Sequence, residues 1–313
     1  MTEIEILAWL LEGDVAIQYQ VHRDLLDAPA AEVAALQKRI EKEGWGAAYL
    51  AKRNPNGHWG RAYYQPKWIS THYTLLDLKN IGLSPDHPQV LESVKIALEL
   101  PRAVDGGINI FKSMDISDVC VNGMVLNFAA WFMPESRRLK EVVDCLLQTQ
   151  MKDGGWNCSH YLGHTHSSVH STLSVLEGLF EFSQTGNPHR EKEIKIARQQ
   201  GLEFLLQHRL FRSHRTGNIF DPKMLRLSYP SRWRFDILRA LDHFQAAHIP
   251  YDERMQDALG VLQKKKRKDN RWPLQAKHPG QVHFDMEKAG EPSRWNTLRA
   301  WRVLKHFNLS IIS

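Results

Sequence analysis

The sequence predicts an all-α fold, an α/α toroid in which helical hairpins close into a ring. Apolar residues recur at helical spacing along the chain, and no alternating pattern is long enough to predict a sheet. A glycine-centred turn recurs at Gly57, Gly106 and Gly154, in steps of 106 − 57 = 49 and 154 − 106 = 48 residues. A repeat of this length with two helices in each unit is typical of stacked helical hairpins. A closed ring of about six hairpins has no internal boundary, so a single domain is expected over residues 1–313.

The first 48 residues are expected to form helices that precede the repeats. Apolar residues at helical spacing over residues 4–27 are interrupted at Gly13-Asp14, which predicts a pair of helices. Residues 30–44 predict a further amphipathic helix. The hairpin repeats are then expected over residues 49–313.

Each repeat is expected to contain a turn, a loop, an apolar inner helix and a charged outer helix. Serine or aspartate stands at the expected start of each inner helix, where it can accept the free N–H groups of the first turn. These residues are Ser70, Asp118, Ser168, Ser231 and Ser293. The charged helices are expected over residues 90–98, 139–148, 194–207 and 255–262. Because all the inner helices run the same way, their N-termini are expected to meet at one mouth of the ring.

The composition narrows the class of protein. A hydrophobic content of 42% is enough for a substantial core, and ten tryptophans suggest an aromatic-lined interior. Three cysteines do not form a disulfide framework, and no signal peptide or transmembrane segment is recognised, so a cytoplasmic location is predicted. The net charge of +6 is modest. The basic run at residues 264–268 is interpreted as a solvated helix end, so no nucleic-acid partner is expected.

Asp118, Cys120 and His170 are the candidate metal ligands. A carboxylate, a thiolate and an imidazole together suit one divalent metal, and zinc is the usual one. Three protein ligands would leave a fourth position for water or substrate, as in catalytic sites. The alternative is a helix-capping aspartate, a buried small residue and a core histidine. A closed structural site would need one more ligand, for which the chain offers His72, Cys158, His160, His164 and His166.

These residues resemble the zinc triad of the protein prenyltransferase β subunits, which belong with squalene and other terpenoid cyclases to one α/α toroid superfamily. Asp118-x-Cys120 opens one helix, and His170 opens the corresponding helix one repeat later. The segment Gly154-Gly155-Trp156 also resembles the repeat motif of the cyclases. The resemblance covers about residues 49–313. It implies a zinc-dependent transferase similar to the bacterial single-chain members of this superfamily.

The resemblance extends only partly to the residues that would bind a prenyl diphosphate. Lys112 keeps the charge of the family's arginine, whereas Asp115, Val121 and Val169 stand where the family has Lys, Tyr and Tyr. Lys112 is therefore a predicted substrate-binding residue. Asp115 is a candidate acid, although the string Asp115-Ile-Ser-Asp118 does not meet the cyclases' Asp-x-Asp-Asp motif, and a capping role is the alternative. His72, at the corresponding helix start of the first repeat, is the second catalytic candidate.

A basic, aromatic-rich segment offers further substrate-binding candidates. Arginine binds carboxylate or phosphate with a forked geometry, and the predicted residues are Arg212, His214, Arg215, Tyr229 and Arg232. The alternative is an irregular loop whose arginines pair with Asp221, Asp236 and Asp242. Trp68, Trp156 and Trp295 are predicted to line the cavity, and ordinary hairpin packing is the alternative for them.

The sequence thus predicts a zinc-dependent enzyme with a metal-activated nucleophile at the mouth of the ring. Its substrate is expected to be a small molecule, either anionic or lipid-like in the manner of an isoprenoid. Zinc-assisted hydrolysis or elimination on a small anionic substrate is the alternative reaction. A non-catalytic binding module with structural zinc is the alternative class. The sequence leaves open whether a partner subunit is needed.

Overall fold

The computed structural model describes residues 1–111 and 115–312, and these residues form an all-α protein without β-strands. Lys112, one of the predicted substrate-binding residues, lies outside the described residues. The helices are α1 Glu3–Leu11, α2 Val15–Asp24, α3 Ala30–Arg39, α4 Gly44–Leu50, α5 Thr71–Ile81, α6 Pro88–Leu98, α7 Val119–Phe132, α8 Arg138–Gln148, α9 Val169–Gln184, α10 Glu191–Gln207, α11 Ile237–Ala246, α12 Gln256–Lys264 and α13 Arg294–His306. Four short 3-10 helices are η1 Lys67–Ile69, η2 His160–Leu162, η3 Pro222–Leu225 and η4 Glu253–Met255. Within the described ranges, no helix combines the length and the apolar character needed to cross a membrane.

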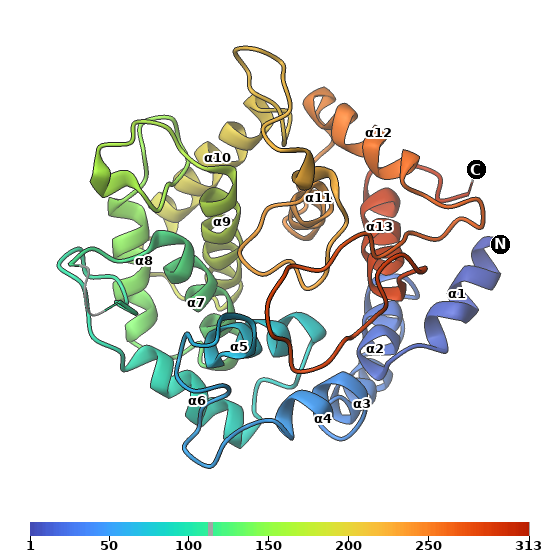
Figure 1. Ribbon diagram of the computed structural model, residues 1–313, viewed down its shortest axis with the longest axis horizontal. Helices are drawn as coiled ribbons and strands as arrows, with labels where there is room; N and C mark the ends of the chain where they lie inside the picture. Colours follow the sequence, from blue (N-terminus) through green and yellow to red (C-terminus); the bar gives the residue numbers. More distant parts are fainter. Residues whose placement is uncertain (112–114, 313) are drawn as a thin grey trace.

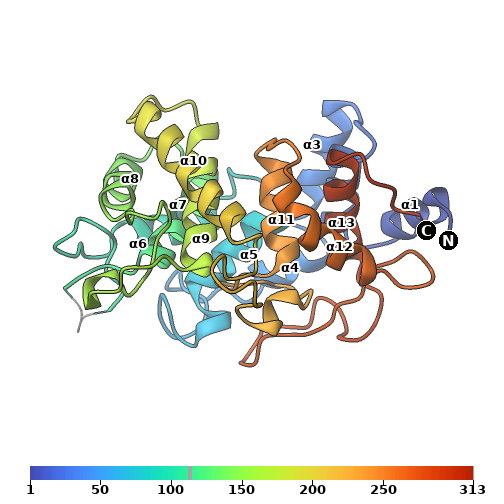
Figure 2. The ribbon, with the colours of Figure 1, turned by 90° about the horizontal axis from the view of Figure 1, so that it is seen from above.

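Six helices stand in sequence order around the middle of the molecule (Figure 1), and we call them the inner helices: α2, α5, α7, α9, α11 and α13. Helices α6, α8, α10 and α12 lie outside them. α7 packs against α5 and α9, and α13 packs against both α11 and α2, so the last inner helix meets the first. The ends of the chain lie together, and the Asn270 side-chain amide donates to the carbonyl of Met1. Figure 2 shows that the loops leading into α9, α11 and α13 lie on the same side of the molecule.

Most of the predicted helices are confirmed. The pair expected over residues 4–27 is α1 and α2, and Asp14 between them accepts the Ala16 N–H at 2.9 Å as the N-cap of α2. The charged helices correspond to α6, α8, α10 and α12. The helix expected over residues 30–44 is shorter than predicted, because α3 ends at Arg39 and the separate helix α4 begins at Gly44.

The predicted start of the fourth repeat's inner helix at Ser231 is wrong. Arg232 has a φ of 59°, which is left-handed backbone that a helix cannot contain. α11 begins instead at Ile237, because Asp236 accepts the N–H of Arg239 at 2.9 Å and caps it. The similarity between Ser231-Arg-Trp and Ser293-Arg-Trp is therefore not a similarity of structure, since Ser293 does cap α13.

Three tryptophans join a helix to the next inner helix by the same pair of hydrogen bonds, which we call the tryptophan clamp. The indole N–H donates to a carbonyl near the end of the preceding helix, and the tryptophan peptide N–H donates at 3.0 Å to a threonine Oγ1 in the first turn of the next. The sets are Trp59 with Tyr49 and Thr71, Trp156 with Leu146 and Thr172, and Trp272 with Leu262 and Thr297. All three tryptophans are wholly buried.

The second repeat keeps only the peptide hydrogen bond of the clamp, with different side chains. Ile108 takes the tryptophan's place, and its N–H donates at 2.8 Å to Oδ1 of Asn122 in the first turn of α7.

The clamp also explains the position of Trp156, which was predicted to bind substrate. Its ring is packed in the core, and its indole N–H donates to the Leu146 carbonyl at 2.7 Å. The position of Trp156 therefore agrees with the alternative prediction, ordinary hairpin packing.

The closest approach of two inner helices is between α7 and α9. A Cβ atom added to Gly178 of α9 would lie 2.3 Å from the carbonyl oxygen of Gly123 of α7. One added to Gly123 would lie 2.7 Å from the carbonyl oxygen of Ser174. Neither distance is sterically possible, so glycine at both positions is what allows the two backbones to touch.

We predict that Gly178→Ala lowers the free energy of unfolding by about 1–3 kcal/mol, because the added methyl group forces α7 and α9 apart. Gly260→Ala is the matched control, since nothing lies within 4 Å of a Cβ atom at this position of α12. There the higher helix propensity of alanine is expected to raise stability by about 0.5–1 kcal/mol. Urea unfolding of both variants measures the two effects, and equal effects would contradict the close contact.

A second prediction concerns the clamp at Trp156. Thr172→Val keeps the shape of the side chain but leaves the buried Trp156 N–H without its acceptor, so the free energy of unfolding should fall by about 1–3 kcal/mol. Thr172→Ser retains the hydroxyl and is expected to lose less. If the two variants are equally stable in urea unfolding, the hydrogen bond does not hold the repeat together.

Candidate metal centre

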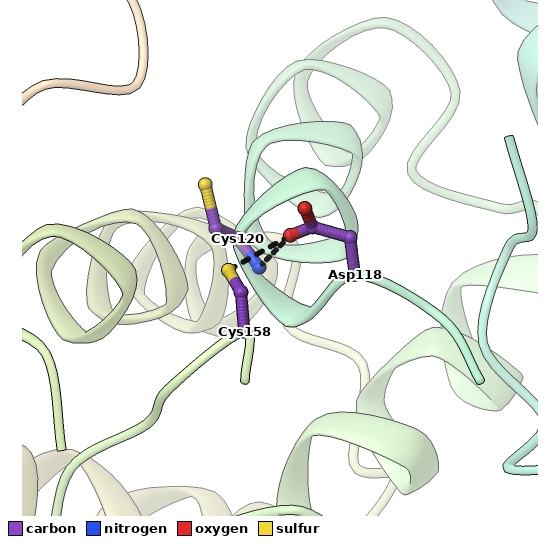
Figure 3. A group of neighbouring side chains, drawn as sticks. All are labelled: Asp118, Cys120 and Cys158. Carbon is purple, nitrogen blue, oxygen red and sulfur yellow. Dashed lines mark hydrogen bonds between the residues drawn. The ribbon is translucent and has the colours of Figure 1, made fainter. Parts of the chain in front are cut away.

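The structure brings Asp118 and Cys120 together with Cys158. One ligand atom from each side chain lies within 4.8 Å of the others (Figure 3). Asp118 is the N-cap of α7, and its Oδ1 accepts the N–H groups of Cys120 at 2.9 Å and Val121 at 3.1 Å. The thiol of Cys158 donates to the same oxygen at 2.9 Å, and its sulfur lies 3.1 Å from the Ser171 hydroxyl. The group therefore joins the start of α7 to the loop before α9, and Ser171 at the start of α9 contacts it.

Two features of the fold place Cys158 against α7. The clamp fixes Trp156 two residues earlier, and the Cys158 N–H donates to the Ser171 hydroxyl at 3.4 Å. The contact between Gly123 and Gly178 holds α9 close to α7. The Asp118–Cys158 approach thus depends on the packing of two repeats.

The surroundings of Cys120 disfavour ionisation of its thiol. Contact with Cys158, burial and the negative charge of Asp118 raise the pKa of the Cys120 thiol well above its ordinary value, against the opposing charge of Arg239. Two thiolates and a carboxylate this close together repel one another unless a cation lies between them. The donor set thus fits a divalent metal that accepts sulfur and oxygen, and zinc is the usual one.

His170 does not belong to this group. Its Nδ1 accepts the backbone N–H of Phe235 at 2.7 Å, and its ring packs edge-on against Trp233. Burial and the charges of Arg239 and Arg234 lower the pKa of His170 to about 4, so the ring is neutral at pH 7. Because Nδ1 accepts a hydrogen bond, the proton of the neutral ring is on Nε2.

Cys158 is the member of the group that was not among the three predicted metal ligands. The sequence offered it as an extra ligand for a closed structural site. Two signals could have pointed to it. It is one of only three cysteines in the chain, and it follows the Gly-Gly-Trp turn by two residues.

The two predicted catalytic residues lie in contrasting surroundings. His72 is wholly buried, its Nδ1 is 2.9 Å from the Tyr63 hydroxyl, and its ring contacts Tyr64 and Phe128. Asp115 is exposed, and its backbone carbonyl accepts the N–H of Val104. Neither carries a ligand atom of the metal group.

The predicted basic segment divides into two separate parts. Arg212 donates to Asp257 of α12 at 2.9 Å, and His214 and Arg215 are exposed on the same loop. Arg232 is instead buried and forms an ion pair with Asp77 of α5. The loop arginine is thus paired on the outer side of the protein, with a partner that was not anticipated.

A central cavity of about 440 Å³ is lined by side chains from all six inner helices. Three predicted substrate-binding residues, Tyr229, Arg232 and Trp295, line it and are 8%, 6% and 2% exposed. Trp68 lies behind them, with the Arg232 guanidinium 5.7 Å from its ring and its indole N–H donated to the carbonyl of Pro279 at 2.6 Å.

The cavity extends to the surface at the far ends of the inner helices. Asn80, Ala246 and His248 line it and are exposed, and they lie at the C-terminal ends of α5 and α11. The sequence predicted that the site opens at the N-terminal ends of the inner helices. The opening differs because the segment before α11, which supplies Tyr229 and Arg232, forms the inner end of the cavity.

No model of a known protein family matches the chain, and no curated protein matches it.

The burial of His72 has a consequence for acid stability. Burial, with a smaller contribution from Lys67, lowers the pKa of His72 to about 3, whereas an unfolded histidine has a pKa of about 6.5. As the pH falls from about 6.5 towards 3, the unfolded chain binds a proton that the native chain does not. The free energy of unfolding should then fall by up to about 1.4 kcal/mol per pH unit because of this residue.

We predict that His72→Phe makes the loss of stability between pH 6.5 and about 4 shallower by up to that amount. Tyr63→Phe is the control, because it removes the hydrogen bond to His72 but leaves the ring buried, and it should keep the steep dependence. Urea unfolding at a series of pH values measures both slopes. A wild-type slope retained by His72→Phe would contradict the prediction.

Proposed function

We propose that the protein is a zinc-dependent enzyme whose zinc is held by Asp118, Cys120 and Cys158. We also propose that its ring of hairpins is the α/α toroid that the sequence resemblance implies. The observation that carries the proposal is the meeting of three suitable ligand atoms within 4.8 Å, two from the start of α7 and one from the loop before α9. Ligands of one tetrahedral zinc lie about 3–4 Å apart, so the side chains need only small movements to share an ion.

Each of the three residues has a distinct part in such a site. Asp118 is fixed by the N–H groups of α7 at Oδ1, which leaves Oδ2 as the second carboxylate oxygen for a metal. Cys120 is buried in α7 and supplies a rigid donor. Cys158 lies on a loop and is only partly buried, so its thiol can turn from Asp118 towards an ion.

Three ligands leave one coordination position for water or substrate, as catalytic zinc sites do. A zinc ion bound there would lower the pKa of a bound water, hydroxyl or thiol and so provide a nucleophile near pH 7. Arg239 connects this site with the central cavity. It lines the cavity, and its positive charge also acts on Cys120, where it opposes the rise in the pKa of the thiol.

The lining of the cavity favours one class of reaction over another. The resemblance implies alkyl or prenyl transfer, which needs an apolar space for an isoprenoid chain. The cavity is lined instead by many charged side chains, among them Lys79, Glu177, Arg239 and Arg302. This observation supports the second candidate, zinc-assisted hydrolysis or elimination on a small polar substrate.

Metal analysis tests the proposed site. Wild-type protein purified under reducing conditions should carry about one zinc per chain, and Cys120→Ser and Cys158→Ser should each lose most of it. Cys145→Ser is the matched control, because Cys145 is also buried but contacts Ser117 rather than the metal group. Full zinc retention in both ligand variants would overturn the assignment.

His170→Ala decides between catalytic and structural zinc. We expect this variant to retain zinc, because Nδ1 of His170 already accepts the Phe235 N–H. Loss of zinc would make His170 a fourth protein ligand. The site would then be closed, and the metal would be structural rather than catalytic.

A further inference from the structure

The central cavity has polar walls with unused hydrogen-bonding capacity. Among the described residues that line it, several have a buried polar atom without a hydrogen-bond partner. These atoms are Asn127 Oδ1, Tyr229 Oη, His243 Nε2, Trp295 Nε1 and Arg299 Nη1. Each residue is at most 8% exposed. Buried polar groups in native proteins are normally paired, so atoms gathered around one cavity indicate a polar occupant.

Three of these groups are hydrogen-bond donors that lie next to one another. The ring of Tyr229 stacks on that of Trp295 with centroids 4.6 Å apart, and the Arg299 guanidinium is 5.7 Å from the Tyr229 ring. The side chains that carry a hydroxyl, an indole N–H and a charged guanidinium N–H are thus neighbours in the cavity wall. Such a set is matched by a ligand with several acceptor oxygens.

Arginines and a lysine outnumber the carboxylates among the side chains that line the cavity. Arg299 donates to Asp242 at 2.9 Å, Arg302 donates to both Asp242 and Asp24, and Arg23 donates to Asp24, so three arginines share two aspartates. Burial opposes the ionisation of Asp242, but Arg302 and Arg299 hold its pKa below the ordinary value, so it remains an anion.

The other charged groups of the wall are balanced in pairs. Arg239 pairs with Glu177 at 2.6 Å and Lys79 with Glu181 at 2.8 Å, and Arg232 pairs with Asp77. Asp236 does not line the cavity but is a third buried carboxylate that acts on Arg299. An anion in the cavity would add acceptor oxygens to the arginine network that includes Arg299.

We propose that the central cavity binds a small oxyanion, a compound carrying a carboxylate or phosphate group, with its oxygens held by Tyr229, Trp295 and Arg299. Asn127 Oδ1 adds an acceptor for a hydroxyl or amine elsewhere on the ligand. A volume of about 440 Å³ is within the usual range for small-molecule sites. The proposal deepens the proposed function by naming the class of substrate. It rests on that function only for the ligand's role as substrate, because the binding itself uses no metal ligand.

Anion binding can be measured with inorganic phosphate and succinate as probes. Thermal unfolding of the full chain at constant ionic strength, with chloride as the reference salt, should show a rise in Tm that grows with the concentration of at least one probe. Isothermal titration calorimetry then gives the dissociation constant. No rise beyond that in chloride with either probe would overturn the proposal.

Tyr229→Phe is the decisive variant, because it removes one unpartnered hydroxyl and keeps the ring that stacks on Trp295. We expect about tenfold weaker binding of the probe with no loss of Tm in its absence. Tyr73→Phe is the control, since the Tyr73 hydroxyl is also buried but is hydrogen-bonded to Tyr64 at 3.0 Å, away from the cavity. It should lose stability and keep binding. Undiminished binding by Tyr229→Phe would overturn the proposal.

A third variant separates this proposal from the metal site. Cys120→Ser removes a proposed zinc ligand and leaves the cavity wall unchanged, so it should bind the probe as the wild type does. Loss of probe binding together with zinc would place the anion on the metal and overturn the cavity site. If the wild type binds the probe but carries no zinc, the cavity site stands and the proposed metal centre is wrong.

Discussion

The architecture depends on the tryptophan clamp, which recurs where α4 leads to α5, α8 to α9 and α12 to α13. A buried peptide N–H and a buried indole N–H both need acceptors, and the clamp supplies a threonine hydroxyl and a helix-end carbonyl. One residue thereby fixes the end of one helix and the start of another. Around Trp156 this also determines the path of the next two residues, and so the position of Cys158. The tryptophan clamp thus helps to set the position of Cys158 beside Asp118 and Cys120.

The Asp118, Cys120 and Cys158 group combines a structural role with a chemical one. Asp118 accepts hydrogen bonds from free N–H groups in the first turn of α7, as an N-cap does in many proteins without a metal. What capping does not explain is the gathering of two of the chain's three cysteines at that carboxylate, where the neighbouring groups disfavour ionisation of Cys120. A bound cation would remove this repulsion. The contact of α7 with α9 through Gly123 and Gly178 is what makes the gathering possible.

The interior differs from a hydrocarbon-binding cavity because of where the aromatic side chains and the charges lie. Tryptophans of the clamp are enclosed between helices, and their rings stabilise the repeats instead of lining the central space. The cavity wall is formed largely by the far halves of the inner helices, which carry arginines, lysine and acids. Cationic side chains near helix C-termini are electrostatically favoured. Ion pairs across neighbouring helices, such as Arg239 with Glu177, then join α11 to α9 while keeping the wall polar.

The sequence by itself determined the all-α class, the repeat, most helix bounds and the pairing of Asp118 with Cys120. These are local properties, because helical periodicity, N-caps and a spacing of two residues are written in adjacent positions. The tertiary structure decided that Cys158 rather than His170 joins that pair, that Arg212 pairs on the outer side with Asp257, and that Tyr229 and Trp295 share one cavity. Those outcomes depend on how closely two helices pack and on the path of an irregular segment. Both are set by contacts between distant residues, which periodicity and local spacing do not encode.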